Sequence, residues 1–188
     1  RRTPARRDSQ DWIAEGLSVL AVEGVDGVRV EILAKRLKVT KGSFYWHFKD
    51  RQALLDAMLD TWRRRATLAV IDHMETLHEL ASVRIASMLQ VPFRAHNPEE
   101  GVNLELSIRQ WGLRDERALS VLSEVDNLRL RYIGALLEKN GTPPEDAKAK
   151  AVVINCFMRV VSALAPTNET HLLAKCEACL LSGGPARR

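Results

Sequence analysis

The sequence has 188 residues, of which 46% are hydrophobic and 28% are charged, and this ordinary soluble composition includes no apolar run long enough to cross a bilayer. The basic N-terminus, "RRTPARRDSQ", is not followed at once by an apolar stretch, which argues against a secretory signal. Three sparse cysteines suit a reducing compartment better than a disulfide scaffold, so we expect a cytoplasmic protein without a membrane partner.

Positive charge gathers near the N-terminus. Residues 1–65 carry 14 Lys and Arg against 9 Asp and Glu, whereas residues 66–188 carry 14 against 15. A basic segment of this kind favours a polyanionic partner, and a solvated basic surface would give the same count. Charge alone leaves both interpretations open.

The first third of the chain predicts four helices. In "DWIAEGLSVLAVEG", apolar residues recur at spacings of three and four, and Gly24 ends the helix. "VRVEILAKRLKV" follows as a short helix, and Thr40 is the expected N-cap of the next one. Asp50 is expected to cap a longer helix, whose apolar face consists of Leu54, Leu55, Met58, Leu59 and Trp62.

The remainder also has a helical period. One helix is expected over "LAVIDHMETLHELASVRIASMLQV" until Pro92, and another after Pro98. Asp115 is expected to cap a long helix that Asn140 and Gly141 stop. Another helix, "EDAKAKAVVINCFMRVVSALA", is apolar on almost all sides in its second half, which predicts burial on more than one face. No strand pattern competes, so the expected fold class is all-α.

A short stretch, "KVTKGSFYWHFKDR", concentrates aromatic rings between basic residues. The two short helices meet at "LKVT", which is the pattern of a helix-turn-helix whose second helix, Lys41 to His47, enters the DNA major groove. Phe44 and Phe48 are four residues apart and are expected to point inward together. A tight hydrophobic corner with no DNA partner is the alternative.

The other rings are expected to face outward. Tyr45, Trp46 and His47 have apolar bodies and polar tips, which suit thymine methyls, sugar edges and phosphates. Gly42 would let the backbone approach the duplex closely. The expected phosphate-neutralising residues are Lys41, Lys49 and Arg51.

The segment "LAKRLKVTKGSFYWHFKDRQALLDAML" resembles the DNA-binding segment of the TetR family of bacterial transcriptional regulators, and the resemblance runs from about Trp12 to Trp62. It implies a helical dimer with a three-helix DNA-reading domain, residues 8–65, and a ligand-binding and dimerisation domain, residues 66–188. Lys38 departs from the family, which often has glycine in this turn. By analogy, the DNA-contacting residues are Thr40, Lys41, Gly42, Ser43, Tyr45, Trp46, His47 and Lys49.

The resemblance also implies a function: a ligand-responsive regulator, usually a repressor, that binds a near-palindromic operator and is released by a small-molecule effector. The expected dimer interface is a four-helix bundle of Asp115–Glu138 and Glu145–Leu164 with their copies. Candidate effector-lining residues, each of which also fits an ordinary core or interface position, are Met88, Leu89, Phe93, Leu106, Arg109, Trp111, Asn155, Phe157, Met158 and Arg159.

Other signals are weak. The arginines at positions 1, 2, 6 and 7 could lie along the duplex or form a solubilising tail. Cys176 and Cys179 have the spacing of half a zinc site, but no second pair exists, so no metal or other cofactor is expected. No phosphate loop or nucleophile motif appears, so we do not expect an enzyme. The alternative function is a helical small-molecule-binding protein or enzyme with a structural ring cluster.

Overall fold

The computed structural model describes residues 7–76, 80–90, 98–160, 175, 176 and 178–180. All regular elements in these ranges are helical, as the sequence predicted. None of the described helices has the length and apolar character needed to cross a membrane. The chain forms two compact units. Unit 1 comprises residues 1–66 and 103–123, and unit 2 comprises residues 67–102 and 124–188.

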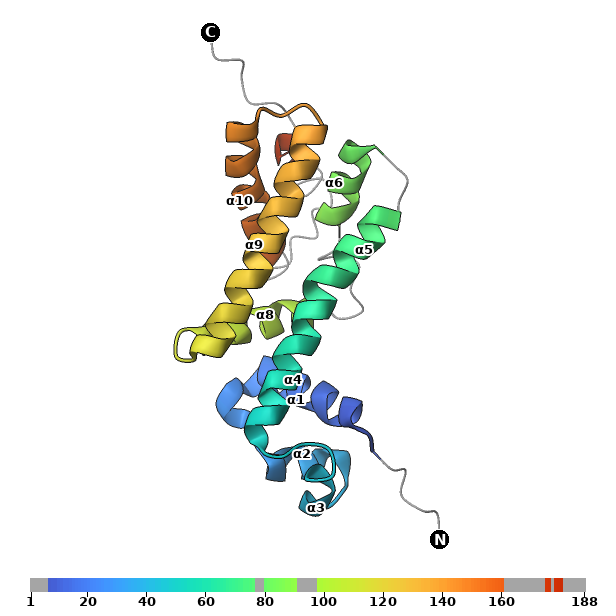
Figure 1. The fold of residues 1–188 in the computed structure, drawn as a ribbon, viewed down its shortest axis with the longest axis vertical. Helices are drawn as coiled ribbons and strands as arrows, with labels where there is room; N and C mark the ends of the chain where they lie inside the picture. Colours follow the sequence, from blue (N-terminus) through green and yellow to red (C-terminus); the bar gives the residue numbers. More distant parts are fainter. Residues whose placement is uncertain (1–6, 77–79, 91–97, 161–174, 177, 181–188) are drawn as a thin grey trace. The chain divides into compact units, whose positions relative to one another are not determined.

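Unit 1 contains five N-terminal elements: α1 (Ser9–Glu23), η1 (Val25–Gly27), α2 (Val30–Leu37), α3 (Lys41–Phe44) and α4 (Arg51–Arg63) (Figure 1). Asp8 and Asp11 form a reciprocal capping box at the start of α1. Gly24 ends α1 with a φ of 71°, a backbone conformation that glycine adopts readily. The Asp50 side chain accepts a hydrogen bond of 2.9 Å from the Ala53 amide, which confirms its predicted capping role.

Two later helices also contribute to unit 1: α8 (Pro98–Gly112) and the beginning of α9 (Glu116–Lys139). Asp115 caps α9, as predicted, by accepting hydrogen bonds from the amides of Arg117 and Ala118. Residues 103–123 therefore group with the N-terminal helices, although they lie within the predicted second domain. The limits of 8–65 and 66–188 stay predictions.

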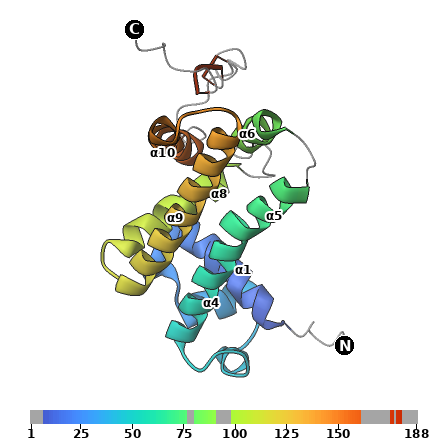
Figure 2. The ribbon, with the colours of Figure 1, turned by 45° about the horizontal axis from the view of Figure 1, so that its top comes forward.

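Unit 2 is built from α5 (Ala69–Thr76), α6 (Ala81–Leu89), the remainder of α9 and α10 (Pro144–Val160). In Figures 1 and 2, α9 runs between α6 and α10. A π-helical segment, η2 (Arg64–Leu68), connects α4 to α5. Apolar side chains from these helices form one core, which consists of Met74, Ile85, Met88, Leu89, Ile133, Leu136, Leu137, Ala147, Ala151, Ile154 and Met158.

Three local expectations need correction. The single helix expected up to Pro92 is divided into α5 and α6, because Leu80 has an extended backbone and begins a new helix. The second helix of the predicted helix-turn-helix is regular only over Lys41–Phe44. Thr40 stands at the N-cap position of α3, but its side chain makes no capping hydrogen bond. The residues predicted to follow Val160 in α10 lie outside the described residues.

Candidate nucleic-acid interface

The turn between α2 and α3 depends on one unusual backbone conformation. Lys38 has φ 57° and ψ 43°, the left-handed region, and it is the only described non-glycine residue with positive φ. Its amide donates to the Lys35 carbonyl at 3.2 Å, and the Val39 amide donates to the Ala34 carbonyl at 3.0 Å. These bonds satisfy carbonyls at the end of α2 and turn the chain toward α3.

The helix α3 is short but is closed by local hydrogen bonds. The Ser43 amide and hydroxyl both donate to the Thr40 carbonyl, at 3.1 and 2.7 Å. After Phe44 the chain continues as a turn, in which the amides of His47 and Phe48 donate to the Phe44 carbonyl at 2.9 and 3.0 Å. The side chains of residues 44–48 therefore point in several directions from this turn.

The aromatic stretch is divided between the interior and the surface, as predicted. Phe44 is fully buried and Phe48 is 8% exposed, with their ring centroids 5.4 Å apart. Trp12 of α1 contacts Phe44 edge-on at 5.2 Å, which ties α3 to the first helix. In contrast, Tyr45 is 63% exposed and Trp46 is 84% exposed. Two large rings thus stand on the surface directly beside a packed aromatic core.

The other predicted DNA-contacting residues surround these rings in the sequence. Thr40, Lys41, Gly42 and Lys49 are exposed, while Ser43 and His47 are half-buried. At Gly42 an added Cβ would lie 3.7 Å from Thr40 Oγ1, which is ordinary van der Waals contact. The protein's own packing therefore does not require glycine at this position.

The charges on this surface differ from the expectation at two positions. Lys41 Nζ pairs with Glu31 Oε1 at 2.8 Å, and both side chains are 60% exposed. Arg51 is not simply a surface cation: its guanidinium donates to the carbonyls of Val28 and Val25, each at 2.5 Å. Arg51 thus holds the start of α4 against η1 and the residue after it. Arg51 therefore has an internal role beside the phosphate neutralisation expected from the sequence, which stays a prediction.

The predicted effector-lining residues are distributed over both units. Leu106, Arg109 and Trp111 belong to unit 1, where Trp111 is buried, Leu106 is 42% exposed, and Arg109 pairs with Glu105 at 2.9 Å. Phe93 lies outside the described residues. The unit 2 members include Met88, Leu89 and Met158, which belong to the buried core, and Phe157, which packs against that core. Arg159 of unit 2 is half-buried.

Asn155 is the clearest polar residue in this set. It is only 8% exposed on α10, and its side-chain oxygen has no hydrogen-bond partner within the described part of the chain. A buried amide oxygen without a hydrogen-bond partner destabilises a folded protein, and a bound hydrogen-bond donor would remove that cost. It is therefore the strongest candidate for orienting a bound molecule in unit 2.

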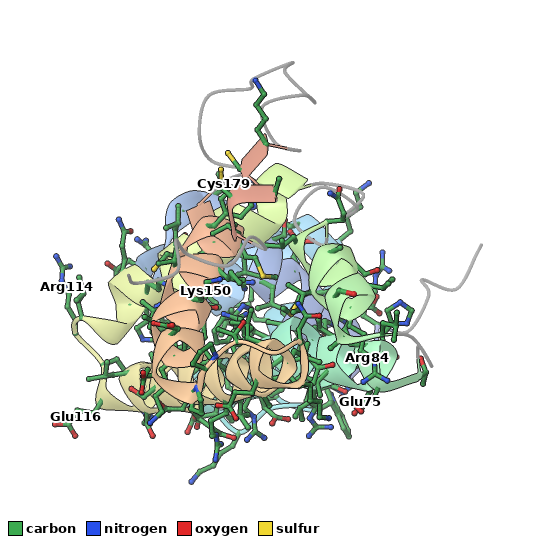
Figure 3. The ribbon with its side chains drawn as sticks, turned by 90° about the horizontal axis from the view of Figure 1, so that it is seen from above. Glu75, Arg84, Arg114, Glu116, Lys150 and Cys179 are labelled. Atoms are coloured by element: carbon green, nitrogen blue, oxygen red, sulfur yellow. The ribbon has the colours of Figure 1, made fainter. Side chains whose placement is uncertain are left out.

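Unit 2 also has a surface recess of about 230 Å³, lined by Ala81, Arg84, Leu136 and Lys139. None of the predicted effector residues that the structure describes lines it. Arg84 beside it pairs with Glu75 at 3.3 Å (Figure 3). Burial, with the nearby Glu75 carboxylate, raises the pKa of Tyr132 to about 12. No group of three potential metal ligands comes together among the described residues.

Comparison with known proteins agrees with this geometry. A family model described as bacterial regulatory proteins of the tetR family matches residues 13–58. The chain is 44% identical over 57 residues to a class G tetracycline repressor protein from Vibrio anguillarum, covering 30% of this chain and 27% of the relative. It is 28% identical over 153 residues to a class E tetracycline repressor protein from Escherichia coli, covering 73% of this chain and 71% of that relative.

The fold is also similar to that of solved structures. A transcriptional regulator from Rhodococcus sp. Rha1 superposes with a TM-score of 0.73 over 93% of this chain and 94% of the other, at 18% identity. Identity at that level shows a shared fold and nothing finer. The match to the class G repressor spans only 27% of that relative, and the segment that the family model matches, residues 13–58, includes the exposed rings. The helix-turn-helix, the ring arrangement and the family model agree over one segment, so residues 13–58 of this chain are similar to the tetR family of bacterial regulatory proteins.

Proposed function

We propose that this chain is a ligand-responsive transcriptional repressor, which binds a near-palindromic DNA operator as a homodimer and leaves it when a small molecule binds. The observation that carries the proposal is the exposure of Tyr45 and Trp46 beside the buried Phe44. Exposed rings are costly unless a partner covers them, and the flanking Lys41 and Lys49 suit a phosphate backbone.

The interface with DNA is proposed to comprise the eight residues predicted from the sequence. Tyr45 and Trp46 would meet sugar edges and thymine methyls, Lys49 would neutralise a phosphate, and Lys41 would meet a phosphate or a base edge. Gly42 supports a close approach, because the protein itself leaves room for a side chain there. In a dimer, the two copies of α3 would enter successive major grooves about 34–36 Å apart.

Dimerisation is proposed to use α9 and α10. On α10, Val152 is 49% exposed and Val153 is 55% exposed, although both lie on a predominantly apolar segment. Leu119 of α9 is 52% exposed. A second copy of the chain would cover such side chains. We expect Val153→Lys to shift the protein toward monomer in sedimentation analysis, while an unchanged dimer would exclude this face.

The effector site is proposed to lie in unit 2, next to Asn155. Buried Met88 and Met158 offer an adaptable apolar wall, and the Asn155 amide oxygen could accept a hydrogen bond from a bound molecule. An amphipathic molecule with one donor group fits these requirements. We expect Asn155→Leu to abolish the thermal stabilisation that a screened effector gives to the parent protein.

The coupling between effector and DNA is proposed to run along α4. This helix buries Leu54, Leu55 and Met58 in unit 1 and continues through η2 into α5 of unit 2. An effector that binds better to one tilt of α4 would shift the dimer toward a spacing that does not fit the operator. Binding of an effector without any change in operator affinity would contradict this mechanism.

The decisive experiment is duplex binding by fluorescence anisotropy as salt is varied. The parent protein should prefer a near-palindrome and lose affinity steeply with salt. Tyr45→Ala and Lys49→Ala should each weaken operator binding while circular dichroism stays unchanged. Lys175→Ala removes the same charge from an exposed position in unit 2 and should leave binding unaltered.

Two results would contradict the proposal. Binding that is insensitive to Tyr45→Ala and Lys49→Ala would place DNA elsewhere. Unfolding caused by both substitutions would show that the ring cluster is structural. That second result favours the alternative function, a helical small-molecule-binding protein.

A further inference from the structure

A glutamate stands on the proposed DNA-reading surface, where a negative charge is unexpected. Glu31 lies in the first turn of α2, and its carboxylate is 2.8 Å from the ammonium group of Lys41, the first residue of α3. The two residues are ten positions apart, and the helix-turn-helix brings their side chains together. Wherever Lys41 meets the duplex, the Glu31 carboxylate is close to it.

Stability does not account for this pair. Both side chains are 60% exposed, and exposed ion pairs contribute little to folding because water already solvates the charges. The hydrogen bond from Lys41 lowers the pKa of Glu31, so the carboxylate remains ionised at neutral pH. An ionised carboxylate beside phosphates weakens binding by repulsion unless it meets a hydrogen-bond donor.

We propose that Glu31 is a specificity-determining residue that accepts a hydrogen bond from the 4-amino group of one cytosine in each operator half-site, while Lys41 donates to a neighbouring guanine. The inference rests on the proposed function, since it needs α3 in the major groove.

The chemistry of base edges selects cytosine. In the major groove only cytosine and adenine present amino donors. Adenine places the N7 acceptor beside its donor, which repels a carboxylate, whereas cytosine presents the donor alone. Guanine presents two acceptors, O6 and N7, which suit a lysine ammonium. A carboxylate and an ammonium held 2.8 Å apart therefore complement a cytosine and a guanine that are close together in the groove.

The first test is selection of duplexes from a random pool by the parent protein, by Glu31→Gln and by Glu23→Gln. Glu23 is a matched control, because it is also an exposed glutamate paired with a basic residue of unit 1, Arg36 at 3.5 Å. Both substitutions remove one negative charge. We expect Glu31→Gln alone to lose the preference for one C·G pair per half-site by about tenfold, with adenine gaining most, since glutamine pairs with adenine N6 and N7.

The second test removes the donor from the DNA. Replacing that cytosine by an analogue without the 4-amino group should cost the parent protein about tenfold in affinity. The same replacement should cost Glu31→Gln little, because the partner is already absent. Circular dichroism and urea unfolding should match for all three proteins, because Glu31 and Glu23 are exposed.

The outcomes separate this inference from the function on which it rests. A selected motif that Glu31→Gln leaves unchanged overturns the cytosine contact alone, and the repressor proposal stands. Equal relaxation by Glu31→Gln and Glu23→Gln also overturns it, because charge would then explain the effect. Failure of the parent protein to select any motif overturns both proposals.

Discussion

Replacing Lys38 by glycine should stabilise the protein and weaken its binding to DNA. Lys38 is held in the left-handed region at φ 57°, where an L side chain costs about 1–2 kcal/mol relative to the right-handed conformation. Glycine removes that cost but also gives the unfolded chain more freedom, which offsets about 0.4–1 kcal/mol. The expected net gain is about 0.5–1 kcal/mol in the free energy of unfolding.

Alanine at the same position separates backbone strain from charge. Lys38→Ala keeps the left-handed strain, so Lys38→Gly should be more stable than Lys38→Ala. Both variants lose the same exposed cation in the turn before α3. If Lys38 neutralises a phosphate, each variant should reduce the slope of log affinity against log salt by about 0.9 for each copy of the chain bound to DNA.

Urea unfolding followed by circular dichroism measures the first effect, and anisotropy titrations at several salt concentrations measure the second. Lys38→Gly that is no more stable than Lys38→Ala would refute the strain argument. A salt slope equal to that of the parent protein in both variants would show that the Lys38 ammonium does not contact the backbone of DNA. The two results are independent, so either argument can fail alone.

Three further predictions follow from side-chain contacts. Gly42→Ala should fold normally and gain up to about 1 kcal/mol of helix propensity, yet bind the operator more weakly; unchanged affinity in anisotropy would mean that DNA does not approach this backbone closely. Arg51→Met should lower the free energy of unfolding by about 2 kcal/mol in urea, because two charged hydrogen bonds to Val25 and Val28 are lost, whereas Lys49→Met should not; equal stabilities would refute this. Tyr132 stays protonated in the folded state up to about pH 12, whereas the phenol of the unfolded chain ionises near pH 10, so the free energy of unfolding should fall between about pH 10 and pH 12. Tyr132→Phe should remove the absorbance step of phenol ionisation near pH 12. A step that persists in this variant would refute the assignment.

The features that could be predicted from the sequence are local. The division of rings between core and surface follows from the four-residue spacing of Phe44 and Phe48, which places both on one side of a single turn. The Asp50 and Asp115 caps were also predictable, because an acidic residue before an apolar helical pattern satisfies the first amides of that helix. Each of these inferences needs only a few neighbouring residues.

The features that were missed depend on distant residues or on weak signals. The partners of Arg51 are 23 and 26 positions earlier, so nothing near Arg51 in the sequence reveals its internal role. The Glu31 and Lys41 pair appears only once the turn has brought α2 and α3 together. The sequence just before α6 contains no Gly or Pro that would signal a break. Leu80, which is 76% exposed, also fits the apolar pattern of a single helix, so the sequence predicted one helix where the structure has two.

If Tyr45 and Trp46 contact DNA as proposed, folding and recognition depend on different side chains of one stretch and are under different selective pressures. Phe44 must keep its shape to pack against Trp12 and Phe48, whereas Trp46 is exposed and Tyr45, also exposed, makes one edge-on ring contact with Phe44 at 5.2 Å. Substitutions at the outward positions can therefore accumulate without unfolding the chain. A duplicated copy of such a protein could drift toward new regulatory targets in small steps, with every intermediate remaining a folded protein.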